Sequence, residues 1–346
     1  MTSALSGSAT PLAQAYDAAL IDLDGVVYRG SDAVLGAREA LLRVRQTDMR
    51  VVFVTNNSSR TPDVIADHLA ELGVPTTATD IVTAADAAAA LLADHVPPPA
   101  DVLVVGAAGL RTALAARGYR SVSLARDKPA AVAQGYTADV TYAELTEAAL
   151  AVRAGAVWVA SNADATLPSD RGLLPGNGAL VAFVATATDR APLVAGKPEP
   201  TLVVEARRRA GATRPLVVGD RADTDVAAAH EAGFDSLLVL TGVSAPTDLP
   251  ALPPAHRPTY LGTGLDALLE SQPVTRVAGT TAQCGDASVA VDGRALLVSL
   301  PPSGGTGGAL DALRACCALV WSGAADAIPS GEVQRTVAAL GVAGDR

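Results

Sequence analysis

The sequence predicts an α/β protein whose main domain is a doubly wound parallel sheet. Three observations predict this class. Short apolar runs alternate with helical patterns along the chain, which is the order expected of a parallel sheet with helices on its faces. Two of these runs end in carboxylates: Asp22 directly follows run 18–21, and Asp220 follows run 216–218 after one glycine. The 346 residues also suffice for two to three domains, since a domain takes about 150 residues.

The apolar runs are short and uninterrupted, as the buried strands of a parallel sheet are. They occupy residues 18–21, 51–54, 102–105, 157–160, 216–218 and 237–240. Helical patterns lie between them. Three of these begin at a residue typical of a helix start, such as Pro in the first turn, and each of the three ends at a Gly. We expect these helices at 62–73, 200–211 and 224–233, with Thr224 capping the third.

The motifs described below divide the chain into a core, an insertion and an appended unit. We expect a Rossmann-like core from residues 16–75 and 191–271, which hold the early and the late motifs. Residues 76–190 separate these two segments, have a strand–helix alternation of their own and are about as long as one domain. They therefore predict an inserted α/β domain.

Residues 272–346 have a different character and predict a small α+β unit. Asp292-Gly293 separates two alternating segments, as in a β-hairpin with a two-residue Asp-Gly turn. The expected strands are 288–291 and 295–299, followed by a loop at 301–308 and by helices near 309–321 and 330–340.

The composition excludes several classes of partner. The net charge of −10 argues against a nucleic-acid surface, because such a surface needs a basic patch. No apolar run approaches the roughly 18 residues of a membrane helix, and residues 1–16 contain no Lys or Arg, which makes them a poor signal peptide. The three cysteines have no metal-site or disulfide spacing and are expected to be small buried hydrophobic residues. We therefore expect a cytoplasmic protein with no nucleic-acid or membrane partner.

Polar residues follow three of the expected strands. Asp22 ends the first, Thr55-Asn56-Asn57 the second, and Asp220 follows the fifth. Ligands of open parallel sheets bind beyond the carboxyl ends of the strands. We therefore expect these three groups to converge at one edge of the sheet.

Asp22 and Asp24 are two residues apart, so in an extended segment they face the same way. Gly25 then allows a sharp turn. A divalent cation relieves the repulsion between such carboxylates, and Mg²⁺ prefers oxygen ligands. We expect Asp22 and Asp220 to offer side-chain oxygens to Mg²⁺ and Asp24 its main-chain carbonyl. The Asp24 carboxyl is then left for proton transfer, and Asp22 can attack a phosphate ester to form an aspartyl phosphate.

Other residues could hold the charged phosphoryl group. Thr55 offers a hydroxyl, and the amides of Asn56 and Asn57 can donate hydrogen bonds. Lys197, between Gly196 and Pro198, could bridge Asp22 and a phosphate oxygen. The remaining acidic residue, Asp225, is expected to orient groups around the metal.

These residues, in this order, resemble the four motifs of the haloacid dehalogenase superfamily. The matching segments are Asp22-Leu23-Asp24-Gly25, Thr55-Asn56-Asn57, Lys197 and residues 219–225. The strings at 55–60, 160–164, 175–178 and 196–198 resemble more narrowly the NagD-like phosphatases. The resemblance covers roughly residues 16–271. It implies a type-IIA cap domain in the insertion and a Mg²⁺-dependent phosphoric monoester hydrolase. The dehalogenases of the superfamily lack an acid equivalent to Asp24, so the chain resembles the phosphatase branch.

The whole layout is similar to that of actinobacterial glycerol-3-phosphate phosphatases, which carry a C-terminal unit related to acetyltransferases. The resemblance implies glycerol 3-phosphate as the substrate and leaves phosphoglycolate, pyridoxal phosphate and nucleotides as alternatives. It places near the substrate Ser58, Ser59, Arg60, Asn162 and Asp164. Residues 272–346 lack the Gln/Arg-x-x-Gly-x-Gly/Ala loop of an active acetyltransferase, so acetyl transfer is not expected.

Two rival functions stay open at this point. A phosphotransferase would pass the phosphoryl group from Asp22 to a sugar instead of water, using every motif named above. A sensor of phosphorylated metabolites would need an inactive site, with residues 272–346 as its output. The sequence also leaves the oligomeric state open, with a homo-oligomer formed through the cap as one arrangement.

Overall fold

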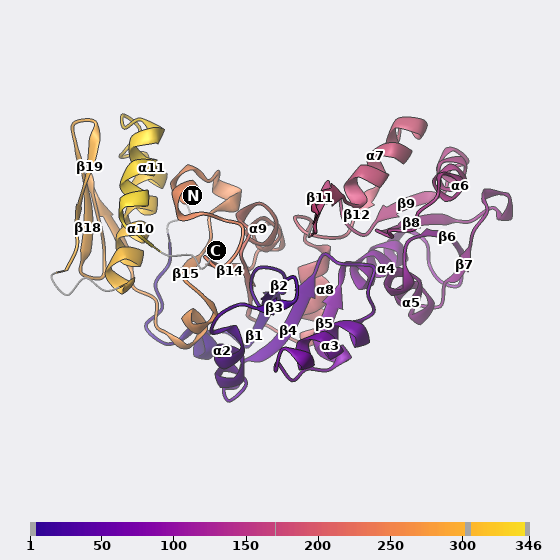
Figure 1. Ribbon diagram of the computed structural model, residues 1–346, viewed down its shortest axis with the longest axis horizontal. Coiled ribbons are helices and arrows are strands. Elements are labelled where there is room, and N and C mark those ends of the chain that lie inside the picture. The colour runs from indigo at the N-terminus through magenta and orange to yellow at the C-terminus, as the bar shows by residue number, and fades with distance from the viewer. Residues whose placement is uncertain (1–4, 170, 302–305, 343–346) are drawn as a thin grey trace. The chain divides into compact units, whose positions relative to one another are not determined.

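The computed structural model describes residues 5–169, 171–301 and 306–342 of the chain (Figure 1). The chain forms two compact units. Unit 1 comprises residues 1–51 and 212–346, and unit 2 comprises residues 52–211. Each unit is mixed α/β with parallel strands, as the alternation of apolar runs and helical patterns predicts.

Parallel strands form the centre of unit 1. They lie side by side in the order β15 (Tyr260–Gly262), β14 (Asp235–Val239), β13 (Pro215–Gly219) and β1 (Ala18–Asp22). Every residue of β1 and β13 is buried. Because Ile21 is paired with Val218, the last residues of these two strands end at the same level of the sheet. The register therefore brings the carboxylates that follow each strand to one edge.

Helix α1 (Leu12–Ala15) precedes the first of these strands in the sequence. Between the strands lie α2 (Ala37–Val44), a π-helical turn (Ala222–Val226) and α9 (Ala227–Ala232), together with a short hairpin formed by β2 (Tyr28–Arg29) and β3 (Asp32–Ala33). The expected cap at Thr224 is wrong, because Thr224 lies inside the π-helical turn. The expected end is confirmed, since Gly233 follows α9 in the left-handed conformation.

The last part of unit 1 is an antiparallel sheet with two helices (Figure 1). Its elements are β16 (Thr275–Ala278), β17 (Thr281–Cys284), β18 (Ala287–Asp292), β19 (Ala295–Ser299), α10 (Thr306–Trp321) and α11 (Ser330–Ala339). The hairpin is confirmed, but its turn residues are Gly293 and Arg294, because Asp292 is still paired with Ala295. The expected loop at 301–308 is shorter, since α10 already begins at Thr306; residues 302–305 of it lie outside the described residues.

This antiparallel sheet shares a hydrophobic core with the parallel strands. Buried side chains of β17, β18 and α10 pack with Leu238 of β14 and Leu261 of β15. The indole of Trp321 donates a hydrogen bond of 3.2 Å to the carbonyl of Leu249. All three cysteines are buried, as expected, and burial raises the pKa of Cys284 to about 11. The C-terminal elements are therefore packed into unit 1 rather than tethered to it.

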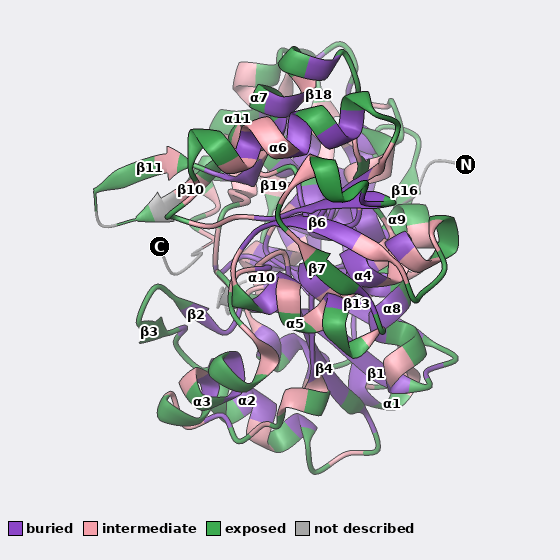
Figure 2. Cartoon of the chain, turned by 90° about the vertical axis from the view of Figure 1, so that its right-hand side faces the viewer, coloured by how far each residue is buried: buried purple, intermediate pink, exposed green. Residues whose placement is uncertain are grey.

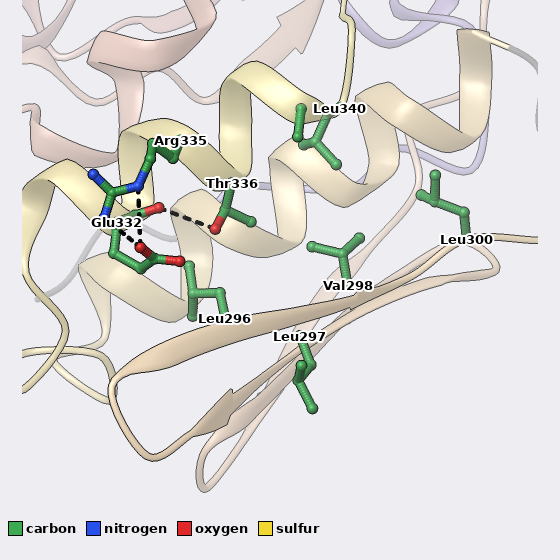
Figure 3. A pocket seen from close by; sticks show the side chains of 9 residues that line it. Leu296, Leu297, Val298, Leu300, Glu332, Arg335, Thr336 and Leu340 are labelled. Carbon is green, nitrogen blue, oxygen red and sulfur yellow. Dashed lines mark hydrogen bonds and ion pairs between the residues drawn. The ribbon is translucent and has the colours of Figure 1, made fainter.

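A groove of about 460 Å³ lies between β19 and α11 (Figure 3). Leu296, Val298 and Leu300 line one side, and Thr336 and Leu340 line the other. The hydroxyl of Thr336 donates 3.0 Å to a main-chain carbonyl one turn earlier in α11. The groove is thus mostly apolar and open to solvent.

Unit 2 contains the end of β4 (Arg50–Thr55), which is paired in parallel with β5 (Ile81–Thr83). A second parallel sheet has the strand order β12 (Leu193–Val194), β9 (Val157–Ala160), β8 (Ala131–Gln134), β6 (Asp101–Val105) and β7 (Arg120–Val122). Four of these strands fall within residues 76–190, where an inserted α/β domain is expected. The exact domain boundaries stay a prediction.

Helices and one hairpin complete unit 2. They are α3 (Pro62–Glu71), α4 (Ala84–His95), α5 (Ala108–Ala116), α6 (Tyr142–Arg153), α7 (Asn177–Thr188), α8 (Thr201–Ala210) and the hairpin of β10 (Thr166–Ser169) and β11 (Gly172–Pro175). The helices expected after Pro62 and Pro200 are confirmed. Figure 2 shows the burial that follows from this arrangement, with strands such as β6 largely buried and the outer faces of helices exposed.

Candidate active site

Three carboxylates gather at the carboxyl edge of the parallel strands in unit 1. Asp22 ends β1, Asp220 follows β13 and Asp225 lies in the π-helical turn. Each offers one oxygen such that all three oxygens lie within 4.8 Å of one another, and all three residues are buried. The predicted convergence is therefore found for Asp22 and Asp220, and Asp225, which was expected to orient groups around the metal, lies with them. Convergence of Thr55-Asn56-Asn57 on the same edge stays a prediction.

Main-chain N–H groups hold two of these carboxylates in place. The N–H of Val243 donates 2.6 Å to Asp220 Oδ2, and the N–H of Arg221 donates 3.1 Å to Asp225 Oδ2. The carbonyl of Asp220 in turn accepts from the N–H of Ser244 at 3.0 Å. The loop after β14 thus fixes the position of Asp220.

Three glycines leave room for these carboxylates. A Cβ atom on Gly242 would lie 1.9 Å from Asp220 Oδ2, one on Gly25 2.5 Å from the same oxygen, and one on Gly219 2.1 Å from Asp225 Cγ. Gly25 also has a φ of +83°, a main-chain conformation that residues other than glycine rarely adopt. Any larger residue at these positions would have to displace a carboxylate.

Gly242 and Val243 contact the carboxylate group, and the sequence reasoning missed both. Their side chains gave no signal, but their position did, because both follow the apolar run 237–240, whose strand ends at the same sheet edge. Nearby, the hydroxyl of Thr241 donates 2.7 Å to the carbonyl of Gly25, which joins this loop to the turn after β1.

The donor set in unit 1 fits a hard divalent cation. Carboxylate oxygens are the ligands that Mg²⁺ prefers, and three buried carboxylates this close repel one another unless a cation or protons offset their charge. Asp24 is exposed, and its carboxylate is not part of this group. The main-chain contribution expected from Asp24 stays a prediction. Beside the group, the Arg221 guanidinium lowers the pKa of Asp223 by hydrogen bonding to its carboxylate.

A second polar group follows β4 in unit 2. Thr55 is buried and its hydroxyl accepts the N–H of Asn57 at 3.1 Å. The Asn57 carbonyl oxygen Oδ1 accepts the N–H groups of Ser59 and Arg60 at 2.9 and 3.0 Å. The side chain of Asn57 therefore fixes the fold of the loop that leads to the exposed Arg60.

Asn56 joins three segments of unit 2 through its side chain. Its Oδ1 accepts the main-chain N–H of Lys197 at 2.8 Å, and its Nδ2 donates to the Lys197 carbonyl at 3.0 Å. The same Nδ2 lies 3.2 Å from a carboxylate oxygen of Asp164, and the main-chain carbonyl of Asn56 accepts from the Asn162 side chain at 2.7 Å. The structure thus brings together Asn56, Lys197, Asn162 and Asp164, four residues predicted from sequence.

Ser58 is buried, and its hydroxyl accepts a hydrogen bond from Ser161 at 2.8 Å. The next residue, Ser59, accepts the N–H of Gly109 on its carbonyl at 3.0 Å. A Cβ on Gly109 would lie 2.4 Å from the carbonyl oxygen of Arg60. The loop at 58–60 is therefore packed directly against the strand ends and helix starts of the second sheet.

Within the described residues, no helix has both the length and the apolar character needed to cross a membrane.

In chemical terms, unit 1 presents a buried cluster of carboxylate oxygens, one of them from Asp22 at the end of a strand. Unit 2 presents a buried lysine, 3% exposed, whose main chain is held by an asparagine. Carboxylate, cation site and lysine are the parts that phosphoryl transfer uses.

Comparison with known proteins agrees with this chemistry. Residues 19–120 match the family described as haloacid dehalogenase-like hydrolase, and residues 194–268 match a second, HAD-hydrolase-like family. The chain is 49% identical over 267 residues to the D-glycerol 3-phosphate phosphatase of Mycobacterium tuberculosis, covering 77% of this chain and 75% of that protein. It is 37% identical over 236 residues to an acid sugar phosphatase of Staphylococcus aureus, covering 68% and 90% of the two chains.

Solved structures are similar over 73% to 90% of this chain. The glycerol phosphate phosphatase of Mycobacterium tuberculosis in complex with magnesium matches with a TM-score of 0.82 and 44% identity, covering 90% of this chain and 92% of that one. The p-nitrophenyl phosphatase of Archaeoglobus fulgidus matches with a TM-score of 0.68 and 28% identity, covering 73% and 98%.

Proposed function

The chain belongs to the haloacid dehalogenase-like hydrolases, and on that premise we propose that it hydrolyses glycerol 3-phosphate to glycerol and phosphate with Mg²⁺ as cofactor. The observation that carries the proposal is the buried group of Asp22, Asp220 and Asp225 at the sheet edge. Its chemistry fits the cation, and Asp22 ends a fully buried strand, which gives a nucleophile a fixed position.

The proposal assigns a role to each group of the chain. An Asp22 oxygen attacks phosphorus, the bond to the glycerol oxygen breaks, and Asp24 gives that oxygen a proton. Asp24 then takes a proton from water as the water oxygen attacks phosphorus, and the bond between phosphorus and Asp22 breaks. Lys197 offsets negative charge on the phosphoryl oxygens.

Mg²⁺ would be held by side-chain oxygens of Asp22 and Asp220 and by the main-chain oxygen of Asp24, with Asp225 orienting these groups. When bound, it supplies the positive charge that lets a carboxylate approach a phosphate dianion. The three glycines and the Val243 N–H described above keep the ligands at fixed positions before any ion arrives.

The choice of glycerol 3-phosphate rests on similarity, because the relative with 49% identity bears that activity in its name. The acid sugar phosphatase, at 37% identity, favours sugar phosphates as the second candidate. In this proposal the polar residues of unit 2 contact the substrate; they are Thr55, Asn56, Asn57, Ser58, Arg60, Asn162 and Asp164. Phosphoglycolate, pyridoxal phosphate and nucleotides remain as further esters to compare.

The test is phosphate release from a panel of these esters, with Mg²⁺ and with a chelator. Asp22→Asn should abolish release, because an amide is a poor nucleophile. Asp223→Asn is the matched control, since Asp223 lies on the same sheet edge but outside the carboxylate group. We expect Mg²⁺-dependent release that is fastest with glycerol 3-phosphate and near wild type in the control.

Each other outcome has a definite meaning. If another ester is hydrolysed fastest, the substrate assignment is wrong and the mechanism stands. If the wild-type protein releases no phosphate but converts an added sugar to its phosphate ester, the protein is a phosphotransferase. If it neither releases phosphate from any ester nor phosphorylates a sugar, the hydrolase proposal is wrong and a sensor of phosphorylated metabolites takes its place.

A further inference from the structure

The contact between two motifs of the inserted segment is not explained by the roles above. The motifs are residues 160–164 and residues 175–178, which pack against each other at the start of α7. Asn177 is the first residue of α7 and is 1% exposed. Its Nδ2 donates 2.7 Å to the main-chain carbonyl of Asn162. A buried amide at this position connects the helix to the loop that carries Asn162 and Asp164.

The glycines on either side of Asn177 fix this contact. A Cβ on Gly176 would lie 2.3 Å from the carbonyl oxygen of Asp164, and one on Gly178 would lie 2.3 Å from that of Ala163. The N–H of Gly178 also donates 2.8 Å to the Asp164 carbonyl. The main chain at the start of α7 therefore contacts the main chain of the loop directly, and this contact directs the Asn177 side chain toward the Asn162 carbonyl.

The hydrogen bonds continue from this loop to Lys197. Asn177 donates to Asn162, the Asn162 side chain donates 2.7 Å to the main-chain carbonyl of Asn56, and the Asn56 side chain binds both the N–H and the C=O of Lys197. Each link joins a side-chain amide to the main chain of the next residue. A Cβ on Gly196 would lie 2.8 Å from Asn56 Oδ1, so the last link is also closely packed.

We propose that Asn177 is a positioning residue that holds Lys197 in place through Asn162 and Asn56, an inference that rests on the proposed function of Lys197. The four residues form an asparagine ladder, Asn177–Asn162–Asn56–Lys197. Because Asn56 binds the main chain of Lys197 on both sides of its Cα, at the N–H and at the C=O, a shift of Asn56 moves the main chain from which the lysine side chain extends. Loss of the Asn177 donor should therefore lower the rate of the chemical step more than it weakens substrate binding.

The variant that tests the ladder is Asn177→Asp. It keeps the size of the side chain, and a carboxylate suits the first turn of a helix, so α7 should still form. It removes the donor and places an oxygen against the Asn162 carbonyl. Asn177→Ala removes the donor without adding an oxygen. Thr188→Val is the matched control, because Thr188 is a buried residue of the same helix whose hydroxyl donates to a carbonyl within α7, at 2.8 Å.

Two readouts are measured on each variant. Steady-state kinetics should show kcat reduced about fivefold or more, the effect of one hydrogen bond, with KM changed less than twofold. Hydrogen exchange at the Lys197 amide, followed by mass spectrometry of overlapping peptides, should become faster, because that N–H is bound by Asn56. Thr188→Val should change neither readout.

A double-variant comparison separates the ladder from a general loss of stability. Asn177→Ala and Asn56→Ala act through one chain of contacts, so the double variant should lose no more activity than Asn56→Ala alone. Two separate effects would instead multiply. Multiplied losses, or a folded Asn177→Asp protein with wild-type kcat, or unchanged exchange at Lys197, would each overturn the inference. If the wild-type protein hydrolyses no ester, the proposed function fails, whereas the exchange experiment still decides whether the ladder holds Lys197.

Discussion

Replacing Gly242 by Ala is the substitution whose effect follows most directly from the geometry of the carboxylate group. Gly242 follows β14, and its Cα faces the carboxylate of Asp220. The adjacent N–H of Val243 holds the same carboxylate at 2.6 Å. A methyl group at position 242 would therefore strike the oxygen that the next residue keeps in place.

The size of the perturbation can be worked from the distances. The new Cβ would lie 1.9 Å from Asp220 Oδ2, whereas ordinary contacts begin at 3.4 Å, so the oxygen or the loop must move by about 1.5 Å. Metal ligands tolerate deviations of only about 0.2 Å. A displacement of about 1 Å near a reacting group can reduce the rate roughly 100-fold. We therefore expect Gly242→Ala to lose about 100-fold in kcat/KM and to need more Mg²⁺ for half-maximal activity.

The assay is phosphate release as a function of Mg²⁺ concentration, together with isothermal titration of Mg²⁺ into the protein. Gly331→Ala is the control, because a Cβ there meets only the end of the Arg335 side chain, at 3.9 Å. In helix α11 this change should raise stability by up to about 1 kcal/mol and leave activity unchanged. If Gly242→Ala keeps kcat/KM and Mg²⁺ affinity within threefold of the wild type, the reasoning about the carboxylate group is refuted.

Three further predictions concern stability. Burial raises the pKa of Asp17, but the hydrogen bonds that its carboxylate accepts, led by those from Thr213, lower the pKa by more, so the net shift is downward. The ionised carboxylate therefore stabilises the fold above about pH 4, and this stabilisation is lost as the pH falls through the folded pKa. In urea titrations the stability difference between the wild type and Asp17→Asn should shrink below about pH 4, and a constant difference would contradict this. Glu205→Gln leaves arginines at 2.7 and 3.0 Å without a counter-charge and should lower the free energy of unfolding by about 2 kcal/mol; an unchanged urea midpoint would count against it. Trp321→Phe removes the buried hydrogen bond to Leu249 and should cost about 1 kcal/mol in thermal or urea unfolding, so wild-type stability would contradict the packing described here.

Much of the fold could be predicted because the buried strands of a parallel sheet have continuous apolar sequences. All six strands expected from the apolar runs are present, from β1 at Ala18–Asp22 to β14 at Asp235–Val239. The strands that were missed are short or poor in β-branched residues, such as β5 (Ile81–Thr83), with three residues, and β8 (Ala131–Gln134), whose one β-branched residue is Val132. Their pairing depends on neighbouring strands, which a local pattern does not contain. The π-helical turn that displaces the expected cap at Thr224 is likewise set by contacts and not by propensity.

The candidate site was predictable where chemistry is concentrated in a few residue types. Asp22, Asp220 and Asp225 were found because carboxylates after buried strands are conspicuous. Gly242 and Val243 were missed because they contribute space and a main-chain N–H, and neither leaves a side-chain signal. Similarly, the sequence indicated that residues 175–178 matter but could not show that Asn177 reaches Asn162, since that contact depends on the tertiary fold.

The central claim is that Asp22 carries the phosphoryl group, and trapping of the intermediate tests it most directly. The protein with Mg²⁺ is mixed with substrate labelled on phosphorus, quenched in acid within one turnover, reduced with borohydride and mapped by mass spectrometry. The account predicts a labelled acyl phosphate whose reduction converts residue 22 alone to homoserine, with no conversion in Asp24 or in Asp220. Phosphate release without any trapped label, or conversion at a different carboxylate, would contradict the account.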